Sequence, residues 1–131
     1  AAGLSALGLL TANHVIDDSR GYLTPWQEAD AVKLRRLADE LEFKAWEELV
    51  IAGVPKDKVR LEWNLLMVYP GQTFDASIRV DDPTDVAGAV AEFHRRNAEA
   101  RLIEARAQEP MLRGVRLTAV GEIEQPTTLS L

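Results

Sequence analysis

The stretch LLMVYPGQTFDASI, residues 65–78, shows the organisation of this chain most plainly. An apolar run ends at Tyr69, the dipeptide Pro70-Gly71 follows, and a second apolar pattern runs to Ile78. Proline pre-sets its own φ angle, and glycine accepts the backbone angles of a tight reversal. Two β-rich runs on either side of such a turn predict a β-hairpin. The stretch contains no recognisable nucleophile, metal cage or phosphate loop, so it predicts a fold and no chemistry.

The composition is that of a single globular domain. The chain has 131 residues, of which 47% are hydrophobic and 27% charged, and it contains no cysteine. The lack of cysteine excludes disulfides and thiolate metal sites and is typical of a reducing cytoplasm. A formal net charge of −6 disfavours nucleic acid as a partner. The longest apolar run, residues 1–12, is too short to cross a membrane. We therefore expect a cytoplasmic protein with no nucleic-acid or membrane partner.

A long helix is predicted from the Thr24-Pro25 dipeptide. Threonine is a good N-cap, proline suits the first helical position, and Gln27 completes a capping box. The helix is expected to run to about Ala52, with Gly53 as its stop. About 28 residues at 1.5 Å each make it about 42 Å long, so one end is expected to project or to meet a neighbour. Its apolar positions recur at steps of three and four: Ala29, Val32, Leu37, Leu41, Ala45, Trp46, Leu49 and Val50.

The remaining elements complete an alternating order. A strand is predicted within residues 11–22, closing at the turn residues 19–21, and strands follow at 59–69, 72–80 and 115–123. A second helix is predicted from a Thr84 or Asp85 cap to about residue 105. The order β-α-β-β-α-β predicts an α+β fold in which two helices, one of them long, cover one face of a four-stranded antiparallel sheet. We assign residues 11–125 to this domain and residues 126–131 to a tail.

The apolar segment AAGLSALGLL, residues 1–10, is expected to pack against another surface. Its glycines and alanines allow close backbone approach. Either the domain itself or a second chain could supply that surface, and we favour a second chain. Leu7 and Leu10 are the residues that we expect at such an interface.

The residues with chemical potential have structural explanations when each is taken singly. His14 and His94 lie in different predicted elements, and a metal or catalytic site would need further partners for them. The aspartate pairs at 17–18 and 81–82 could contribute to a magnesium site, but beside turns they more often cap or solvate. Trp26, Trp46 and Trp63 could line a ligand pocket, although core or interface packing is more common. We predict no catalytic, cofactor-binding or metal-binding residue in this chain.

Several segments, taken in order, resemble the C-terminal domain of the hydantoinase A, oxoprolinase and acetone carboxylase family. The similar segments are Ser5-Ala6-Leu7-Gly8-Leu9-Leu10, Tyr69 with Gly71 and Gln72 before Phe74 and Asp75, Phe93-His94, and Arg116 with Thr118 to Gly121. Each piece is weak alone, but their order and spacing hold from residue 1 to residue 123. The chain departs from the family at Val68, where an arginine is usual, and at Leu66, where an acid is usual. Asn97, Arg101 and Leu102 also replace a histidine and a Tyr-Gly pair.

The resemblance implies a subunit of a larger enzyme. It is strongest to the small stand-alone subunit of the acetophenone carboxylases, biotin-independent enzymes that use ATP to carboxylate a ketone. The expected partners of this chain are larger hydantoinase A/B-like subunits of a hetero-oligomer. Those subunits are also expected to hold ATP and Mg²⁺. The apolar leader, the long helix and the apolar hairpin would then dock on those subunits.

Two alternatives stay open. The chain could be a subunit of an ATP-dependent hydantoinase or oxoprolinase complex, or a small regulatory module that binds a ligand in a tryptophan-lined pocket with His94 at its mouth. If any residue reaches an active site, we expect it to be Tyr69, Gln72 or His94.

Overall fold

The computed structural model describes residues 9–71, 75–100 and 109–126 and contains a four-stranded antiparallel sheet with two α-helices. The strands are β1 (Leu9–Pro25), β2 (Val59–Val68), β3 (Ala76–Val80) and β4 (Met111–Pro126), in the spatial order β1-β4-β2-β3. The helices are α2 (Ala31–Ile51) and α3 (Val86–Ala100), with 3₁₀ turns η1 (Trp26–Glu28) and η2 (Lys56–Lys58). This confirms the predicted fold class. No described helix is both long enough and apolar enough to span a membrane.

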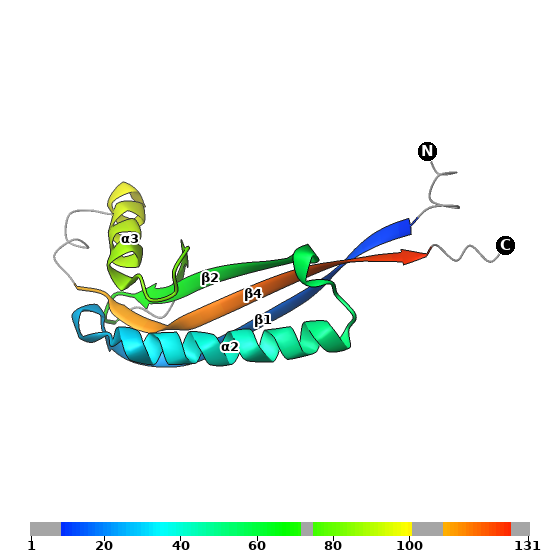
Figure 1. Ribbon diagram of the computed structural model, residues 1–131. Helices are drawn as coiled ribbons and strands as arrows, with labels where there is room; N and C mark the ends of the chain where they lie inside the picture. Colours follow the sequence, from blue (N-terminus) through cyan, green and yellow to red (C-terminus); the bar gives the residue numbers. More distant parts are fainter. Residues whose placement is uncertain (1–8, 72–74, 101–108, 127–131) are drawn as a thin grey trace.

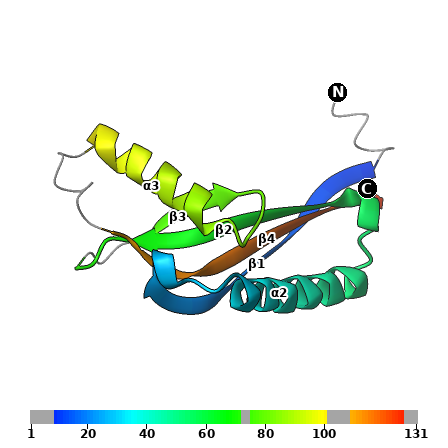
Figure 2. The same ribbon diagram turned by 60° about the vertical axis from the view of Figure 1, so that its left-hand side comes forward.

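Both helices cover the same face of the sheet, as predicted. Along β2 the core residues Trp63, Leu65 and Met67 alternate with more exposed ones, and Ile78 of β3 lies opposite Leu65 on the same face. Side chains of α2 and α3 join these strand residues in one hydrophobic cluster. Figures 1 and 2 show α2 running along the long strands, while α3 lies at the end of the sheet that carries β3.

The predicted hairpin is present, and its apolar residues are mostly part of the core. β2 and β3 pair antiparallel around the Pro70-Gly71 turn, where Gly71 has a φ of 86° that favours glycine. Leu65, Met67 and Ile78 are completely buried. The hairpin is therefore apolar mainly because it fills the domain's own interior, and Leu66, half-buried, lies on the opposite face.

The start of the long helix is the main error of the sequence prediction. The N-cap is Asp30, whose carboxylate accepts a hydrogen bond from the Val32 amide at 2.9 Å, and the predicted capping box at Thr24 is not formed. Pro25 is still part of β1, opposite Met111 of β4, so residues 24–25 are extended. The strand also continues past residues 19–21, which were predicted to end it. Long-range pairing to β4 overrides these local turn and cap signals.

The helix is also shorter than predicted and does not outrun the sheet. α2 has 21 residues, whereas β1 has 17 and β4 has 16. A strand rises more than twice as far per residue as a helix, so both strands are longer than α2. The predicted stop is confirmed, because Gly53 has a φ of 81° and the Val54 amide donates to the Leu49 carbonyl at 3.0 Å.

Candidate functional site

Tyr69 and His94, two of the three residues favoured for a site, lie in contact. Tyr69 follows the end of β2 and is 1% exposed, and His94 lies on α3. The Tyr69 hydroxyl and His94 Nδ1 are 2.8 Å apart, and the Tyr69 ring packs on Phe93 with ring centroids 4.6 Å apart. Gln72 and Leu7 lie outside the described residues. Leu10 belongs to β1, where it pairs with Gln125 of β4.

The geometry of this pair suits an aromatic anchor better than a catalytic site. A catalytic histidine is normally oriented by an acid and placed beside a nucleophile or a substrate atom. In the described parts of the chain His94 hydrogen-bonds to Tyr69 and to no carboxylate. The hydrogen bond and the ring contacts instead tie α3 to the end of β2. The three tryptophans do not stack on His94, whose ring neighbours are Tyr69 and Phe93.

The aspartates mainly form ion pairs and caps. The Asp17 carboxylate pairs with the Arg116 guanidinium across β1 and β4, and this hydrogen bond lowers the pKa of Asp17 and raises that of Arg116. The Asp82 carboxylate accepts hydrogen bonds from the backbone and hydroxyl of Thr84 and from Arg35, and the Thr84 bonds lower its pKa most. Among the described residues, no group of three metal-ligating side chains converges.

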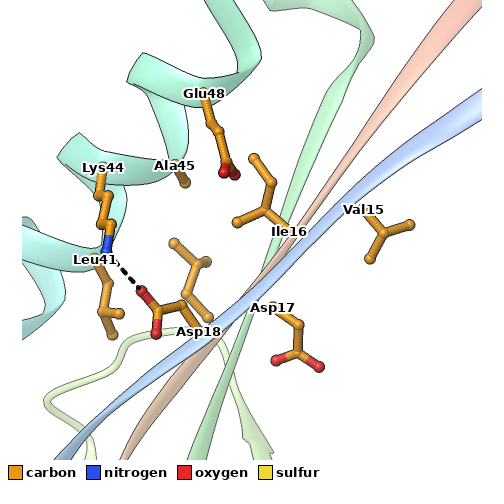
Figure 3. Close-up of a pocket in the computed structure, with 9 residues that line it drawn as sticks. Val15, Ile16, Asp17, Asp18, Leu41, Lys44, Ala45 and Glu48 are labelled. Carbon is orange, nitrogen blue, oxygen red and sulfur yellow. Dashed lines mark ion pairs between the residues drawn. The ribbon is translucent and has the colours of Figure 1, made fainter. Parts of the chain in front are cut away.

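A groove lies between β1 and α2, and Figure 3 shows its lining. Ile16 and Asp18 point from β1 toward the helix, while Val15 and Asp17 point to the other side of the strand. Lys44 of α2 lies 4.0 Å from the Asp18 carboxylate. With several charged groups and a volume of about 380 Å³, the groove is open and polar and has no arrangement of nucleophile and base.

The outer face of α2 carries an apolar stripe that the sequence prediction did not identify. Val32, Phe43 and Val50 are 76%, 69% and 63% exposed. At 100° per residue these three positions lie within about 20° of one another. Leu34 and Leu41, which face the sheet, lie on the other side of the helix. The three- and four-residue spacing grouped Val32 and Val50 with Leu41, whereas the structure exposes Val32 and Val50 and buries Leu41 against the sheet. The spacings of 11 and 7 residues from Val32 to Phe43 to Val50 could have revealed the stripe.

A shallow groove of about 580 Å³ occupies the C-terminal half of this outer face. Its lining is mainly apolar and consists of Phe43, Trp46, Glu47, Val50, Ile51 and Lys56. Ile51 is 83% exposed, the highest value among the large exposed hydrophobic side chains. A contiguous exposed apolar surface rimmed by charges is typical of a protein–protein contact. The outer face of α2 is therefore the strongest candidate interaction surface in the described structure.

Comparison with known proteins shows what the fold resembles. No protein-family profile and no curated protein matches the sequence. A nucleotide-free structure of acetone carboxylase, from a study of ATP-dependent acetone carboxylation, matches with a TM-score of 0.60 and 24% identity, over 88% of this chain and 18% of that one. The crystal structure of the ATP-dependent caprolactamase from Pseudomonas jessenii matches with a TM-score of 0.65 and 14% identity, over 96% of this chain and 19% of that one.

Both matches are below 25% identity, and their TM-scores show a shared fold. The chain spans about a fifth of the length of either matched chain. It thus has the fold of one segment within two much longer chains, both from ATP-dependent enzymes.

Proposed function

We propose that this chain is a small, non-catalytic structural subunit or domain of an ATP-dependent enzyme complex of the hydantoinase A, oxoprolinase and acetone carboxylase family. The observation that carries the proposal is the shared fold with a segment of acetone carboxylase that is 18% of that chain. The ordered sequence similarity at Tyr69, Gly71 and Phe93-His94 supports the same family. The lack of a convergent catalytic set in the described residues supports a structural role.

The outer face of α2 would dock on a larger subunit. Phe43, Val50 and Ile51 expose apolar surface that nothing in the described chain covers. Burial of such side chains is the usual source of affinity at the centre of a stable interface. The charged residues Glu47 and Lys56 border the groove and would form its polar rim.

The nucleotide chemistry would belong to the larger subunits. The glycine spacing of the sequence matches no phosphate-binding motif, and among the described residues no three metal-ligating side chains converge. We therefore assign ATP and Mg²⁺ to partner chains. The specific reaction that we propose is the carboxylation of acetophenone with bicarbonate and ATP to give benzoylacetate.

One alternative reaction is supported by a specific observation. The likeness to a caprolactamase favours a complex that acts on a cyclic amide, as a hydantoinase or oxoprolinase does. The proposed structural role of this chain is the same in both cases. The substrate of the assembled complex distinguishes them.

The test is affinity purification of the tagged chain from its source cells, followed by an assay of the purified complex. We expect larger hydantoinase-like chains in stoichiometric amounts. The complex should hydrolyse ATP when acetophenone and bicarbonate are both present, with benzoylacetate detected by mass spectrometry. ATP hydrolysis that responds to hydantoin, 5-oxoproline or caprolactam instead would support the cyclic-amide alternative.

Two results would overturn the structural role. One is that no hydantoinase-like chain binds the tagged protein, either from the source cells or after co-expression. The other is a thermal shift of the isolated chain with a ketone or a nucleotide, which would favour the ligand-binding module instead.

A further inference from the structure

The strand β1 is a long, unpaired edge of the sheet. It has 17 residues and pairs with β4 on one side, while the strand order β1-β4-β2-β3 leaves its other side without a neighbour among the described strands. An edge strand presents a row of free backbone amides and carbonyls, which is a template for another strand. Natural edges are often blunted by charge, proline or a bulge. The described bulge in β1 lies near its C-terminal end, between Gly21 and Thr24.

Two hydrogen bonds at Ser19 show which backbone groups face outward. The Ser19 amide donates to the Asp18 carboxylate at 2.8 Å, and the Ser19 carbonyl accepts from the Arg20 guanidinium at 3.1 Å. Ser19 therefore directs its backbone groups away from β4 and has both capped by its neighbours. In an antiparallel ladder the outward direction recurs at every second residue.

By that alternation the backbone groups of Asn13, Val15 and Asp17 also point outward. Their register with β4 is regular from residue 9 to residue 21, so the alternation is unbroken there. In the described ranges no side chain caps these three residues as Asp18 and Arg20 cap Ser19. The edge is thus closed at Ser19 and open over residues 13–17.

We propose that residues 13–17 pair antiparallel with the same residues of a second copy, with Val15 on the two-fold axis. Two four-stranded sheets would then join into one sheet of eight strands. In this register the open groups of Asn13, Val15 and Asp17 meet those of Asp17, Val15 and Asn13 of the other copy. This proposal is independent of the proposed enzymatic role.

Neighbouring registers are less favourable because they oppose like charges or meet backbone groups that are already capped. A two-fold axis on Asp17 places that carboxylate opposite its own copy, and an axis on Asp18 does the same for Asp18. Like charges directly opposite each other destabilise a strand pair. An axis on Ile16 places Asn13 opposite Ser19, whose backbone groups are already capped. An axis on His14 places two imidazoles opposite each other and sets Val15 opposite Asn13 instead of a second valine.

The side chains on the outer face suit the register on Val15. Val15 is 56% exposed, and its opposition to a second valine forms a β-branched cross-strand pair. Asn13 would lie opposite Asp17, where its amide can donate to a carboxylate already held by Arg116. The outer face therefore offers an apolar pair between two polar pairs.

The side chains on the helix-facing side are also complementary. His14 would lie opposite Ile16 of the other copy and diagonal to Asp18, and both of these residues line the groove in Figure 3. The groove contributes the carboxylates of Asp18 and Glu48 together with the Lys44 ammonium. The two-fold symmetry makes this contact twice, which favours a second copy over an unrelated strand.

The test uses the natural lack of cysteine in the chain. In the Val15→Cys variant the sole thiols of two copies face each other across the axis. Directly opposed residues of a hydrogen-bonded pair have Cα atoms about 5.5 Å apart, within the span of a disulfide. We expect mild oxidation to give a disulfide-linked dimer. The matched control is Leu23→Cys on the same strand, since Leu23 is 68% exposed and lies about 50 Å from its own copy in this register.

The expected result is a crosslinking rate at least tenfold higher for Val15→Cys than for Leu23→Cys. Equal rates would reveal random collision and would overturn the proposal. Sedimentation velocity supplies the second measurement. The natural chain should form a dimer, and the Val15→Lys variant, which sets two ammonium groups opposite each other, should shift toward the monomer. Because the proposed contact joins two chains of net charge −6, raising the salt concentration should favour the dimer. A dimer that persists in Val15→Lys, or a natural chain that stays monomeric at high salt, would also overturn the proposal.

Discussion

Substitutions on the two faces of α2 should have different effects: those on the inner face should weaken folding, and those on the outer face should weaken assembly. Phe43 is 69% exposed in the isolated chain, whereas Leu49, six residues further along, is completely buried. The substitution Phe43→Ala should therefore weaken docking on a larger subunit much more than it weakens the fold. The substitution Leu49→Ala should do the reverse.

The exposed fraction gives the size of each effect. A phenylalanine side chain offers about 200 Å², so the buried third of Phe43 is about 60 Å², worth about 1.5 kcal/mol of folding free energy at 25 cal/mol per Å². The exposed remainder is about 140 Å², worth at most about 3.5 kcal/mol if the partner covers it fully, or about 300-fold in Kd. Ordering costs reduce this value, so a loss of 30- to 300-fold is expected. Leu49→Ala should cost about 2–5 kcal/mol of folding free energy.

The assays are urea denaturation of the isolated variants and calorimetric titration against the larger subunit obtained by co-purification. Val32→Ala is a useful second variant, because Val32 lies on the same stripe at the other end of the helix and reports how far the contact extends. If Phe43→Ala binds the larger subunit within twofold of the natural chain, the outer face of α2 is not the docking surface. A loss of folding free energy above about 3 kcal/mol for Phe43→Ala would show that the side chain is not exposed as described.

Three further substitutions test the sheet and the aromatic anchor. A Cβ at Gly114 would lie 2.5 Å from a β1 backbone carbonyl oxygen, so Gly114→Ala should cost about 1–3 kcal/mol of unfolding free energy, and a neutral result would contradict the β1–β4 register. The Arg116 hydrogen bond lowers the Asp17 pKa below its ordinary 3.8, so the stabilisation is full above that value and is lost as the pH falls through the lowered pKa. Asp17→Asn should remove this acid-dependent loss from a stability–pH profile. The loss should amount to less than about 1 kcal/mol because the pair is exposed. An unchanged profile would contradict the ion pair. Tyr69→Phe keeps the ring but removes the hydrogen bond to His94, so we expect about 0.5–1.5 kcal/mol less stability by thermal melting and unchanged activity of the assembled complex. A large loss of activity at unchanged stability would instead give Tyr69 a role in the reaction.

Local patterns predicted the elements whose boundaries depend on neighbouring residues. The Pro70-Gly71 hairpin and the stop at Gly53 were predicted correctly. The second helix was predicted to be capped by Thr84 or Asp85, and the Asp85 carboxylate accepts from the Gly88 amide at 3.0 Å. In each case the signal is a backbone angle or a hydrogen bond within a few residues. The order of these elements was enough to predict the α+β class and the single covered face.

The start of α2 depended on contacts that local patterns do not contain. The Thr24-Pro25 signal is a good helix start, yet the Trp26 amide donates to the Pro110 carbonyl at 3.3 Å and the Asp30 amide donates to the Tyr22 hydroxyl at 3.0 Å. These bonds carry the chain from β1 through η1 and delay the helix until Ala31. The same long-range pairing with β4 extends β1 past its predicted end.

For the candidate surfaces too, some properties were determined by the sequence and others only by the tertiary structure. Sequence alone determined that an apolar hairpin and a long helix with apolar residues at three- and four-residue steps existed, because residue type and spacing are local properties. Tyr69, Gln72 and His94 were candidates from the family resemblance and were not predicted to meet. The tertiary structure decided that the hairpin fills the core, that the Tyr69 hydroxyl meets His94, and that Phe43 and Val50 face outward. Burial and contact depend on which faces of distant elements meet, and a helix with two apolar stripes does not reveal by itself which stripe the sheet will cover.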